Sequence, residues 1–545
     1  MPNTTLRRNL RQADLFAAIF RTGVRPFAQA LAGATAAVLA CAALAQTPTV
    51  AATPPLKFEI GAYRVTGDTL LGESEIQALV APFTGKGMDF GDIQKALKAI
   101  REAYAKSGYR GVAVALPEQE LGAGIVNIVV TENAIEKLEV SGNGHFGSEA
   151  VRALFPMLEE GKAVDFDRLG RALDVVNENP ALKTVVEIAP GSREAVRLAR
   201  IVVTDESPLN WFASLDNSGT DATGKHRLGL GVRHADVGGL GHIVTAQYSV
   251  SVEKSSAVSF WGLGYRLPLP ARGLSLDVYG GHSDVSSGTV AGLFDVAGKG
   301  TVAGARATWQ LDRSGGYRHR FAAGIDYREF NNKVVPVGGN QSLVPDYTVH
   351  PLNFSYAGDH GPTSFSISLL RGFTGGANTD SATLGQARIG ADANYSLLRF
   401  AADSALPLAA GWLGRLAISG QQTGDPLVPG EQFGLGGAQS VRGFDERYLA
   451  GDSGGRAAFE IHTPLGQFGS AQVKGLAFID YGELRRNEVL PGELAAESMS
   501  SWGLGTRLLL AKQLSLSLDV ARVLHGPAGQ TAGSGRVHLS LQASF

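Results

Sequence analysis

Cysteine is nearly absent from this chain: among 545 residues, Cys41 is the only one. One thiol forms neither an intrachain disulfide nor a cysteine-based zinc site, which excludes disulfide-stapled secreted domains and zinc ribbons. The 11 histidines are scattered and form no HExxH pair, so their spacing gives no support for a histidine metal site. We therefore predict neither a metal nor any other cofactor.

An excess of charge of one sign is also missing. Lys and Arg number 49, Asp and Glu number 51, and the formal net charge is -2 at pH 7. This balance leaves no basic surplus for nucleic-acid phosphates, so we do not expect a nucleic-acid partner. With 44% hydrophobic residues and a mean hydropathy of +0.02, the composition fits neither a disordered chain nor a bundle of membrane helices.

Long apolar runs are scarce as well. No uncharged apolar stretch after residue 46 is long enough for a transmembrane helix, which needs about 20 such residues. This part of the chain can therefore cross a membrane only as strands closed into a barrel, because open strand edges would leave backbone groups unpaired in lipid.

The first 45 residues have the pattern of an export signal. Residues 1–27 carry five arginines and one aspartate, and Ala28–Ala45 is uncharged and ends in Ala-Leu-Ala. A basic region, an apolar region and a small-residue cleavage site in this order predict a secretory signal cleaved after Ala45. A single membrane anchor is the alternative, although the run is mostly Ala and Gly. Residues 46–56, with three prolines, then form a short linker.

Two small α+β units are predicted next, at 57–132 and 133–207. In each, helical spacing of apolar residues and period-two alternation give the order strand, helix, helix, strand, strand. One continuous α+β domain is the alternative, but the repeated order favours tandem units. The expected strands are 57–66, 112–116, 124–131, 135–140, 183–188 and 199–204, and the expected helices are 73–81, 89–107, 148–158 and 165–177.

From residue 208 to residue 545 the periodicity becomes alternating. In the last run, apolar Val537, Leu539 and Leu541 interleave with polar His538 and Ser540. Such strands fit either a soluble sandwich or an outer-membrane barrel with one lipid-facing and one lumen-facing side, and the export signal favours the barrel. We predict sixteen antiparallel strands, near 209–216, 226–236, 242–252, 257–267, 273–284, 299–312, 318–330, 348–357, 363–373, 386–404, 412–422, 454–464, 473–483, 500–510, 513–523 and 535–545.

Two enzyme-like motifs do not support an enzyme. Gly451–Gly455 spells GDSGG, as in trypsin-like proteases, but no matching histidine motif accompanies it and a strand follows where the GxSxG elbow needs a helix. Gly219–Lys225 spells GxxxxGK, but His226 replaces the required Ser or Thr. We interpret the second motif as a hairpin turn and predict no catalytic residue.

The longest connection of the barrel, 423–453, carries the most informative motifs. Leu427–Gly454 reads LVPGEQFGLGGAQSVRGFDERYLAGDSG. It resembles the large loop of the two-partner secretion transporters, the haemolysin and filamentous-haemagglutinin secretion proteins of the Omp85 superfamily. The residues that carry this resemblance are Glu431-Gln432-Phe433, Gly436-Gly437, Val441-Arg442-Gly443-Phe444 and Gly451-Asp452.

Other parts of the chain resemble the same family. Phe478-Ile479-Asp480-Tyr481-Gly482 matches its second barrel motif, the tandem α+β units look like its two POTRA domains, and Phe545 matches the usual outer-membrane targeting signal at the C-terminus. The resemblance implies that the loop folds into the barrel and that Arg442 pairs with Asp480. The alternation supports this, because Asp480 faces the lumen if Ile479 and Tyr481 face lipid. The alternative is that Arg442 and Asp480 are unrelated surface charges.

The family resemblance implies a bacterial outer-membrane transporter with periplasmic POTRA domains. It would recognise a large partner exoprotein, of adhesin or haemolysin type, and secrete it unfolded through the barrel. Further implied partners are outer-membrane lipid and the barrel assembly machinery for its own insertion, and we expect a monomer. The alternative is an Omp85-type factor that inserts other barrels. Well-known members carry an N-terminal plug helix, for which 46–56 is too short, so either the plug is absent or cleavage falls before Ala45.

Overall fold

The computed structural model describes residues 56–545, apart from gaps at 68–69, 121–123, 194, 222, 256–257, 285–287, 291–293, 297–298, 332–343, 490 and 528–529. The predicted export signal and nearly all of the linker 46–56 lie outside the described residues. Among the helices that are described, none combines the length and the apolar character needed to span a membrane.

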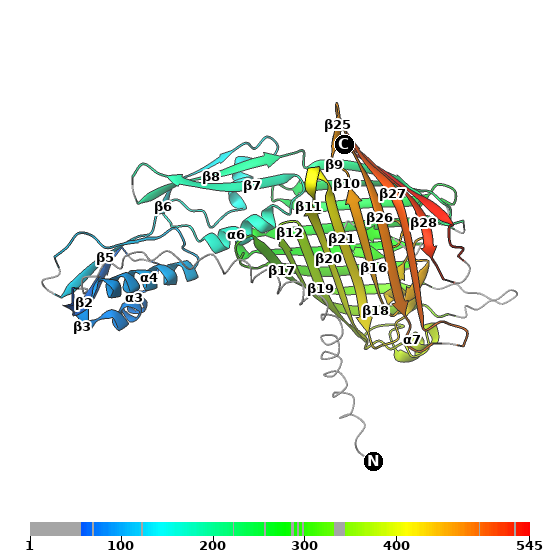
Figure 1. The fold of residues 1–545 in the computed structure, drawn as a ribbon, viewed down its shortest axis with the longest axis horizontal. Helices are drawn as coiled ribbons and strands as arrows, with labels where there is room; N and C mark the ends of the chain where they lie inside the picture. The colour runs from blue at the N-terminus through cyan, green and yellow to red at the C-terminus, as the bar shows by residue number, and fades with distance from the viewer. Residues whose placement is uncertain are drawn as a thin grey trace, which may run out of the picture. The chain divides into compact units, whose positions relative to one another are not determined.

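The first α+β unit is built on a three-stranded sheet (Figure 1). Strand β5 (Ile125–Thr131) lies in its centre, parallel to β2 (Ala62–Thr66) and antiparallel to β4 (Ala113–Ala115). The helices are α3 (Glu73–Val80) and α4 (Phe90–Lys106). The apolar residues of α4 that recur at intervals of three and four are buried from Ile93 onward, whereas Phe90 at its start is exposed. The buried residues of α4 are Ile93, Ala96, Leu97, Ile100 and Tyr104.

The predicted strand 57–66 is interrupted in the structure. The N–H groups of Gly61 and Ala62 both donate to the carbonyl of Gly124, at 2.7 and 3.2 Å, which breaks the regular ladder. The residues before the break form β1 (Phe58–Ile60), which pairs with β3 (Gly85–Met88). Alternation could not predict β3, because its sequence Gly-Lys-Gly-Met has no apolar face.

The second α+β unit repeats the topology of the first. Its central strand β8 (Val196–Asp205) is parallel to β6 (Ala134–Ser141) and antiparallel to β7 (Leu182–Pro190). Its helices are α5 (Ser148–Ala153) and α6 (Phe166–Val176). The predicted helix 148–158 is too long, because Pro156 has no N–H to donate and its ring disfavours helical geometry in the preceding residue.

In the described part of the chain, sixteen long antiparallel strands close into a barrel, as predicted (Figure 1). Two further hairpins are small: β14 (Gly288–Val290) pairs with β15 (Phe294–Val296), and β25 (Gly466–Phe468) pairs with the start of β26. The barrel strands are β9 (Leu209–Asp216), β10 (Arg227–Val237), β11 (His242–Ser251), β12 (Ser259–Leu269), β13 (Leu274–Ser283), β16 (Gly300–Gln310), β17 (Tyr317–Phe330), β18 (Tyr347–His360), β19 (Thr363–Phe373), β20 (Ser396–Pro407), β21 (Leu413–Thr423), β24 (Ser453–His462), β26 (Ala471–Arg485), β27 (Ala496–Leu510), β28 (Leu514–His525) and β29 (Gly535–Ser544).

The barrel wall has an apolar outer face and a polar inner face. On β26, Ile479 and Tyr481 are 50% and 48% exposed, whereas Asp480 between them is fully buried. The exposed large apolar side chains include all five tryptophans, which fits a surface that lipid covers. The structure therefore places Asp480 on the inner side of the wall. The five tryptophans are Trp211, Trp261, Trp309, Trp412 and Trp502.

One predicted strand, 386–404, begins too early. The side chain of Asp380 accepts a hydrogen bond from the N–H of Thr383 and caps a short helix, α7 (Ser381–Ala387), and β20 begins only at Ser396. Between them the chain turns at Gly390, whose φ is +76°. A helix cap and a glycine turn therefore replace the expected strand start.

Candidate functional site

The long loop between β21 and β24, residues 424–452, folds into the barrel. It contains a short helix, η4 (Pro429–Glu431), and a hairpin of β22 (Phe433–Leu435) and β23 (Leu449–Gly451). We call residues 424–435 and 449–452 the stem and residues 436–448 the tip. Gly436 and Gly437 turn the chain from stem to tip with φ of +106° and +104°, a conformation that glycine adopts without strain.

Arg442 ties the tip to strand β26. Its Nε and Nη2 donate to Oδ2 and Oδ1 of Asp480, both at 2.8 Å, and its backbone N–H donates to Oδ2 at 3.1 Å. The pair is buried, since Asp480 is 0% and Arg442 is 4% exposed. Two parallel charge-assisted hydrogen bonds hold position and orientation together. The structure thus brings together the two residues assigned to loop anchoring, and their role in secretion stays a prediction.

Two further carboxylates surround the Arg442 guanidinium. Glu460 Oε1 on β24 lies 2.9 Å from Nη1, and Asp519 Oδ2 on β28 lies 3.7 Å from the same nitrogen. Each has a second cation: Arg415 donates to Glu460 at 3.3 Å, and Arg507 donates to both oxygens of Asp519 at 2.7 and 2.8 Å. Neither acid could be predicted from the sequence, because each is one polar residue on an alternating strand and no motif marks it.

Phe478, from the predicted barrel motif, supports the same arginine. The guanidinium carbon of Arg442 lies 3.4 Å from the centre of the Phe478 ring, a cation–π contact. Gly503 on β27 leaves room for the ring, because a Cβ there would lie 2.4 Å from Cζ of Phe478. Arg442 is therefore held by carboxylates through its edge and by an aromatic ring through its face.

The other tip residues predicted from the motif are also seated in the barrel. The Gly443 N–H donates to Nε2 of His538 on β29 at 2.9 Å, and Gly443 has a φ of +94°. Val441 and Phe444 are 0% and 1% exposed and belong to one apolar cluster with the stem and the wall. The other buried members of this cluster are Leu435, Leu449, Leu484, Met499 and Val523.

Gly482, the last residue of the barrel motif, makes space for this cluster. A Cβ at Gly482 would lie 2.8 Å from Cδ2 of Leu435 and 3.1 Å from Cγ2 of Val441. Both distances are shorter than ordinary van der Waals contact, so a side chain here would displace Leu435 and Val441 from their present positions.

We expect Gly482→Val to displace the loop while the barrel still forms. The control is Gly455→Val on β24, where the nearest atom to an added Cβ is a backbone oxygen at 3.7 Å. Limited proteolysis of purified protein measures the effect: Gly482→Val should be cleaved within 424–452 faster than wild type and Gly455→Val should not. If the two variants resist proteolysis equally, the loop does not depend on the space at Gly482.

A second buried ion cluster holds the stem at Glu431. Arg328 on β17 donates through Nη1 to both carboxylate oxygens of Glu431, at 2.7 and 2.9 Å, and Arg399 Nη2 on β20 lies 3.6 Å from Oε2. Arg328 also donates to Asp326 at 2.7 Å. Glu431 is 0% exposed. Glu431 belongs to the predicted loop motif, but its partners could not be predicted from the sequence because they lie 103 and 32 positions away.

Asp452 closes the stem. Its Oδ1 accepts the N–H of Leu427 at 2.8 Å, and its Oδ2 accepts the N–H of Asn487 at 2.7 Å and Nη2 of Arg388 at 2.8 Å. Asp452 is fully buried. One carboxylate therefore links the two stem segments, 424–435 and 449–452, to the connection between β19 and β20 and to the connection between β26 and β27.

The two enzyme-like motifs have structural roles. The hydroxyl of Ser453 donates to the carbonyl of Thr423 at 3.1 Å and accepts its N–H at 3.0 Å. Gly219–Lys225 forms the turn between β9 and β10, with the N–H of Gly219 donating to the carbonyl of Lys225 at 3.0 Å. The prediction of a hairpin turn for the second motif is confirmed.

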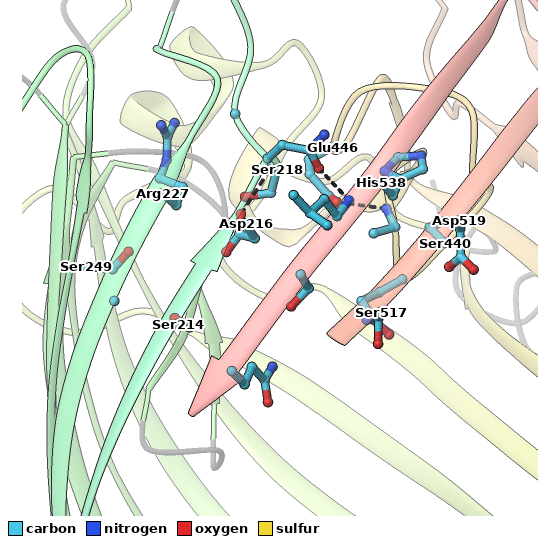
Figure 2. A pocket seen from close by; sticks show the side chains of 18 of the residues that line it. Ser214, Asp216, Ser218, Arg227, Ser249, Ser440, Glu446, Ser517, Asp519 and His538 are labelled. Carbon is cyan, nitrogen blue, oxygen red and sulfur yellow. Dashed lines mark hydrogen bonds between the residues drawn. The ribbon is translucent and has the colours of Figure 1, made fainter. Parts of the chain in front are cut away.

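A polar cavity of about 970 Å³ lies beside the tip (Figure 2). Its lining comes from the tip and from strands on both sides of the junction between β29 and β9. Hydroxyls and paired charges supply about half of the lining, so an extended polypeptide would meet hydrogen-bond partners there. Figure 2 labels Ser214, Asp216, Ser218, Arg227, Ser249, Ser440, Glu446, Ser517, Asp519 and His538.

Phe545, the predicted targeting residue, lies at the closure of the barrel. Its N–H donates to the carbonyl of Trp211 at 2.9 Å and its own carbonyl accepts the N–H of Trp211 at 2.8 Å. The side chain is 67% exposed. A role in targeting stays a prediction.

Within the residues that the structure describes, no group of three or more His, Cys, Asp and Glu is arranged to hold a metal ion.

Two family models match the chain. The one described as haemolysin secretion/activation protein ShlB/FhaC/HecB matches residues 199–508, and the one described as POTRA domain, ShlB-type, matches residues 58–133. Similar proteins include the outer membrane transporter CdiB of Escherichia coli O6:K15:H31, 24% identical over 75% of this chain and 69% of the relative. The hemolysin transporter protein HpmB of Proteus mirabilis is 21% identical over 88% of this chain and 84% of the relative.

Solved structures show the same fold. CdiB from Escherichia coli superposes with a TM-score of 0.72 at 20% identity, covering 92% of this chain and 93% of that one. CdiB from Acinetobacter baumannii superposes with a TM-score of 0.65 at 18% identity, covering 91% of each chain.

Proposed function

The chain belongs to the haemolysin secretion/activation protein family ShlB/FhaC/HecB, and from this premise we propose that it exports one dedicated partner polypeptide through its barrel. It is an outer-membrane β-barrel transporter with a POTRA domain. We propose an exoprotein of adhesin or haemolysin type, secreted unfolded. The observation that carries this proposal is the seated loop: Arg442 and Asp480 hold the loop tip against the inner wall of the barrel beside the cavity.

The inner surface suits passage of an unfolded chain. The cavity offers hydroxyls and ion pairs, which can exchange hydrogen bonds with the backbone of a moving chain. The tip takes up part of the lumen, so transport requires that the tip shift or that the segment pass beside it. Folding of the exported chain outside the cell supplies direction, without ATP or covalent catalysis.

The α+β units would recognise the partner by strand addition. In the described residues, β7 pairs with β8 alone, and its Val185 is 62% exposed. The backbone groups on its outer side can pair with an extended segment, while exposed side chains select it. We propose that 57–132 and 133–207 are both POTRA domains, that 1–45 is the signal and 46–56 the linker, and that 208–545 is a monomeric barrel inserted by the assembly machinery into outer-membrane lipid.

Deleting the gene and comparing supernatant and outer-membrane proteomes with the parent strain tests this proposal. We expect one large extracellular protein to disappear while the barrel proteins of the outer membrane remain, because a dedicated exporter serves one partner. Re-expression of the gene should restore that protein. Depletion of several barrel proteins would instead support the assembly-factor alternative. An unchanged supernatant would contradict the export of a partner polypeptide.

A further inference from the structure

The barrel closes where its last strand, β29, meets its first strand, β9, and this seam is short. Its ladder has five residue pairs, from Ser540 opposite Asp216 to Ser544 opposite Phe212, and Trp211 and Phe545 exchange two backbone hydrogen bonds beyond them. The adjacent ladders have nine pairs between β28 and β29 and eight between β9 and β10. Residues 535–539 of β29 therefore extend past the end of β9. Their backbone N–H and C=O groups on the β9 side need other hydrogen-bond partners.

Asn217, the first residue after β9, supplies two of these partners with its side chain. Its Oδ1 accepts the N–H of Leu539 at 2.8 Å, and its Nδ2 donates to the carbonyl of Val537 at 2.7 Å. The carboxamide combines an acceptor oxygen with a donor nitrogen, so it imitates the backbone of a longer strand. The backbone N–H of Asn217 also donates to the carbonyl of Leu539 at 3.3 Å, so both the side chain and the backbone of Asn217 extend the seam where the ladder ends.

Arg536 on β29 also binds the residues that follow β9. Its Nη2 donates to the carbonyls of Asn217 and Gly219, at 2.8 and 2.7 Å. Its Nη1 contacts the carboxylate of Asp445, which belongs to the loop tip. One guanidinium therefore touches both sides of the seam and the loop.

We propose that Arg536 is a positioning residue that couples the loop tip to the barrel seam. With the tip seated, Asp445 fixes the guanidinium against the end of β9. The seam is then held by Arg536 and Asn217 as well as by its backbone pairs. When the tip leaves, Arg536 loses its carboxylate and the extension of the seam weakens. The inference deepens the proposed function and rests on it for its role in transport, but the coupling itself is measured without any partner polypeptide.

Hydrogen exchange measured by mass spectrometry on the purified full-length protein tests the coupling. Asp445→Asn is the decisive variant, because Asp445 lies on the tip and takes no part in the seam ladder. We expect amides in peptides covering 209–216 and 540–545 to exchange about tenfold faster, as when one charge-assisted hydrogen bond is lost. Arg536→Met should accelerate exchange in the same peptides at least as much. Exchange in peptides of the β18–β19 ladder should stay at the wild-type rate.

Two further variants complete the experiment. Ser214→Cys with Gln542→Cys, which face each other in the seam ladder, should cancel the acceleration by Asp445→Asn when oxidised, in a Cys41→Ser background. Glu483→Gln, which removes an exposed carboxylate on β26, should leave the seam unchanged. Unchanged exchange in Asp445→Asn would overturn the coupling, as would equal acceleration of the β18–β19 ladder. If the coupling holds and no partner is secreted, the proposed function fails and the seam inference stands.

Discussion

Arg442→Ala is expected to lower secretion of the partner to less than about a tenth of wild type while the barrel still reaches the outer membrane. The change leaves fully buried Asp480 without its cation and leaves Glu460 with Arg415 and His462 as its remaining partners. Breaking a buried ion pair by removing one partner costs about 3–5 kcal/mol. That cost falls on the seated loop, whereas the sixteen-stranded ladder is untouched. Immunoblots of supernatant and outer-membrane fractions measure the two quantities.

The Asp480 variants should reduce secretion by different amounts. In Asp480→Asn the arginine keeps Glu460 at 2.9 Å, so we expect a smaller loss than in Arg442→Ala. Asp480→Ala removes both acceptor oxygens and should fall between these two. Arg485→Ala is the matched control, because Arg485 is an exposed arginine at the end of the same strand. Normal secretion by both Arg442→Ala and Asp480→Ala would show that this pair does not anchor a functional loop.

Glu431→Ala is expected to lower the stability of the protein. It leaves Arg328 buried with Asp326 as its remaining carboxylate partner among the described contacts, and it removes the acceptor that Arg399 approaches at 3.6 Å. A loss of about 3–5 kcal/mol is the usual size for a broken buried pair. We expect a lower midpoint temperature for the change in gel mobility that marks barrel unfolding in detergent, together with reduced secretion.

Glu431→Gln separates charge from shape at this anchor. The amide keeps one acceptor for Arg328 but no charge, so its midpoint should lie between those of wild type and Glu431→Ala. Glu483→Ala, which removes an exposed carboxylate paired with Arg485, serves as the control and should not shift the midpoint. If Glu431→Ala unfolds at the wild-type temperature, the stem is not held by this cluster.

The barrel strands could be predicted because lipid and lumen impose a strict period of two. On β26 the apolar neighbours Ile479 and Tyr481 place Asp480 inside before any contact is known. The prediction fails at 386–404, where the cap formed by Asp380 and the turn at Gly390 determine the structure. These are local hydrogen-bond and backbone effects that hydrophobic periodicity does not report.

What the sequence alone determined is the architecture: two α+β units, sixteen alternating strands, and a long loop whose motifs single out Arg442 and Asp480. Only the tertiary structure decided the rest of the anchoring network. Glu460, Asp519 and the partners of Glu431 are polar residues on strands full of polar residues, and nothing local distinguishes them. Their roles arise because barrel closure brings positions far apart in the chain to one point inside the wall, out of water, where each charge requires a partner.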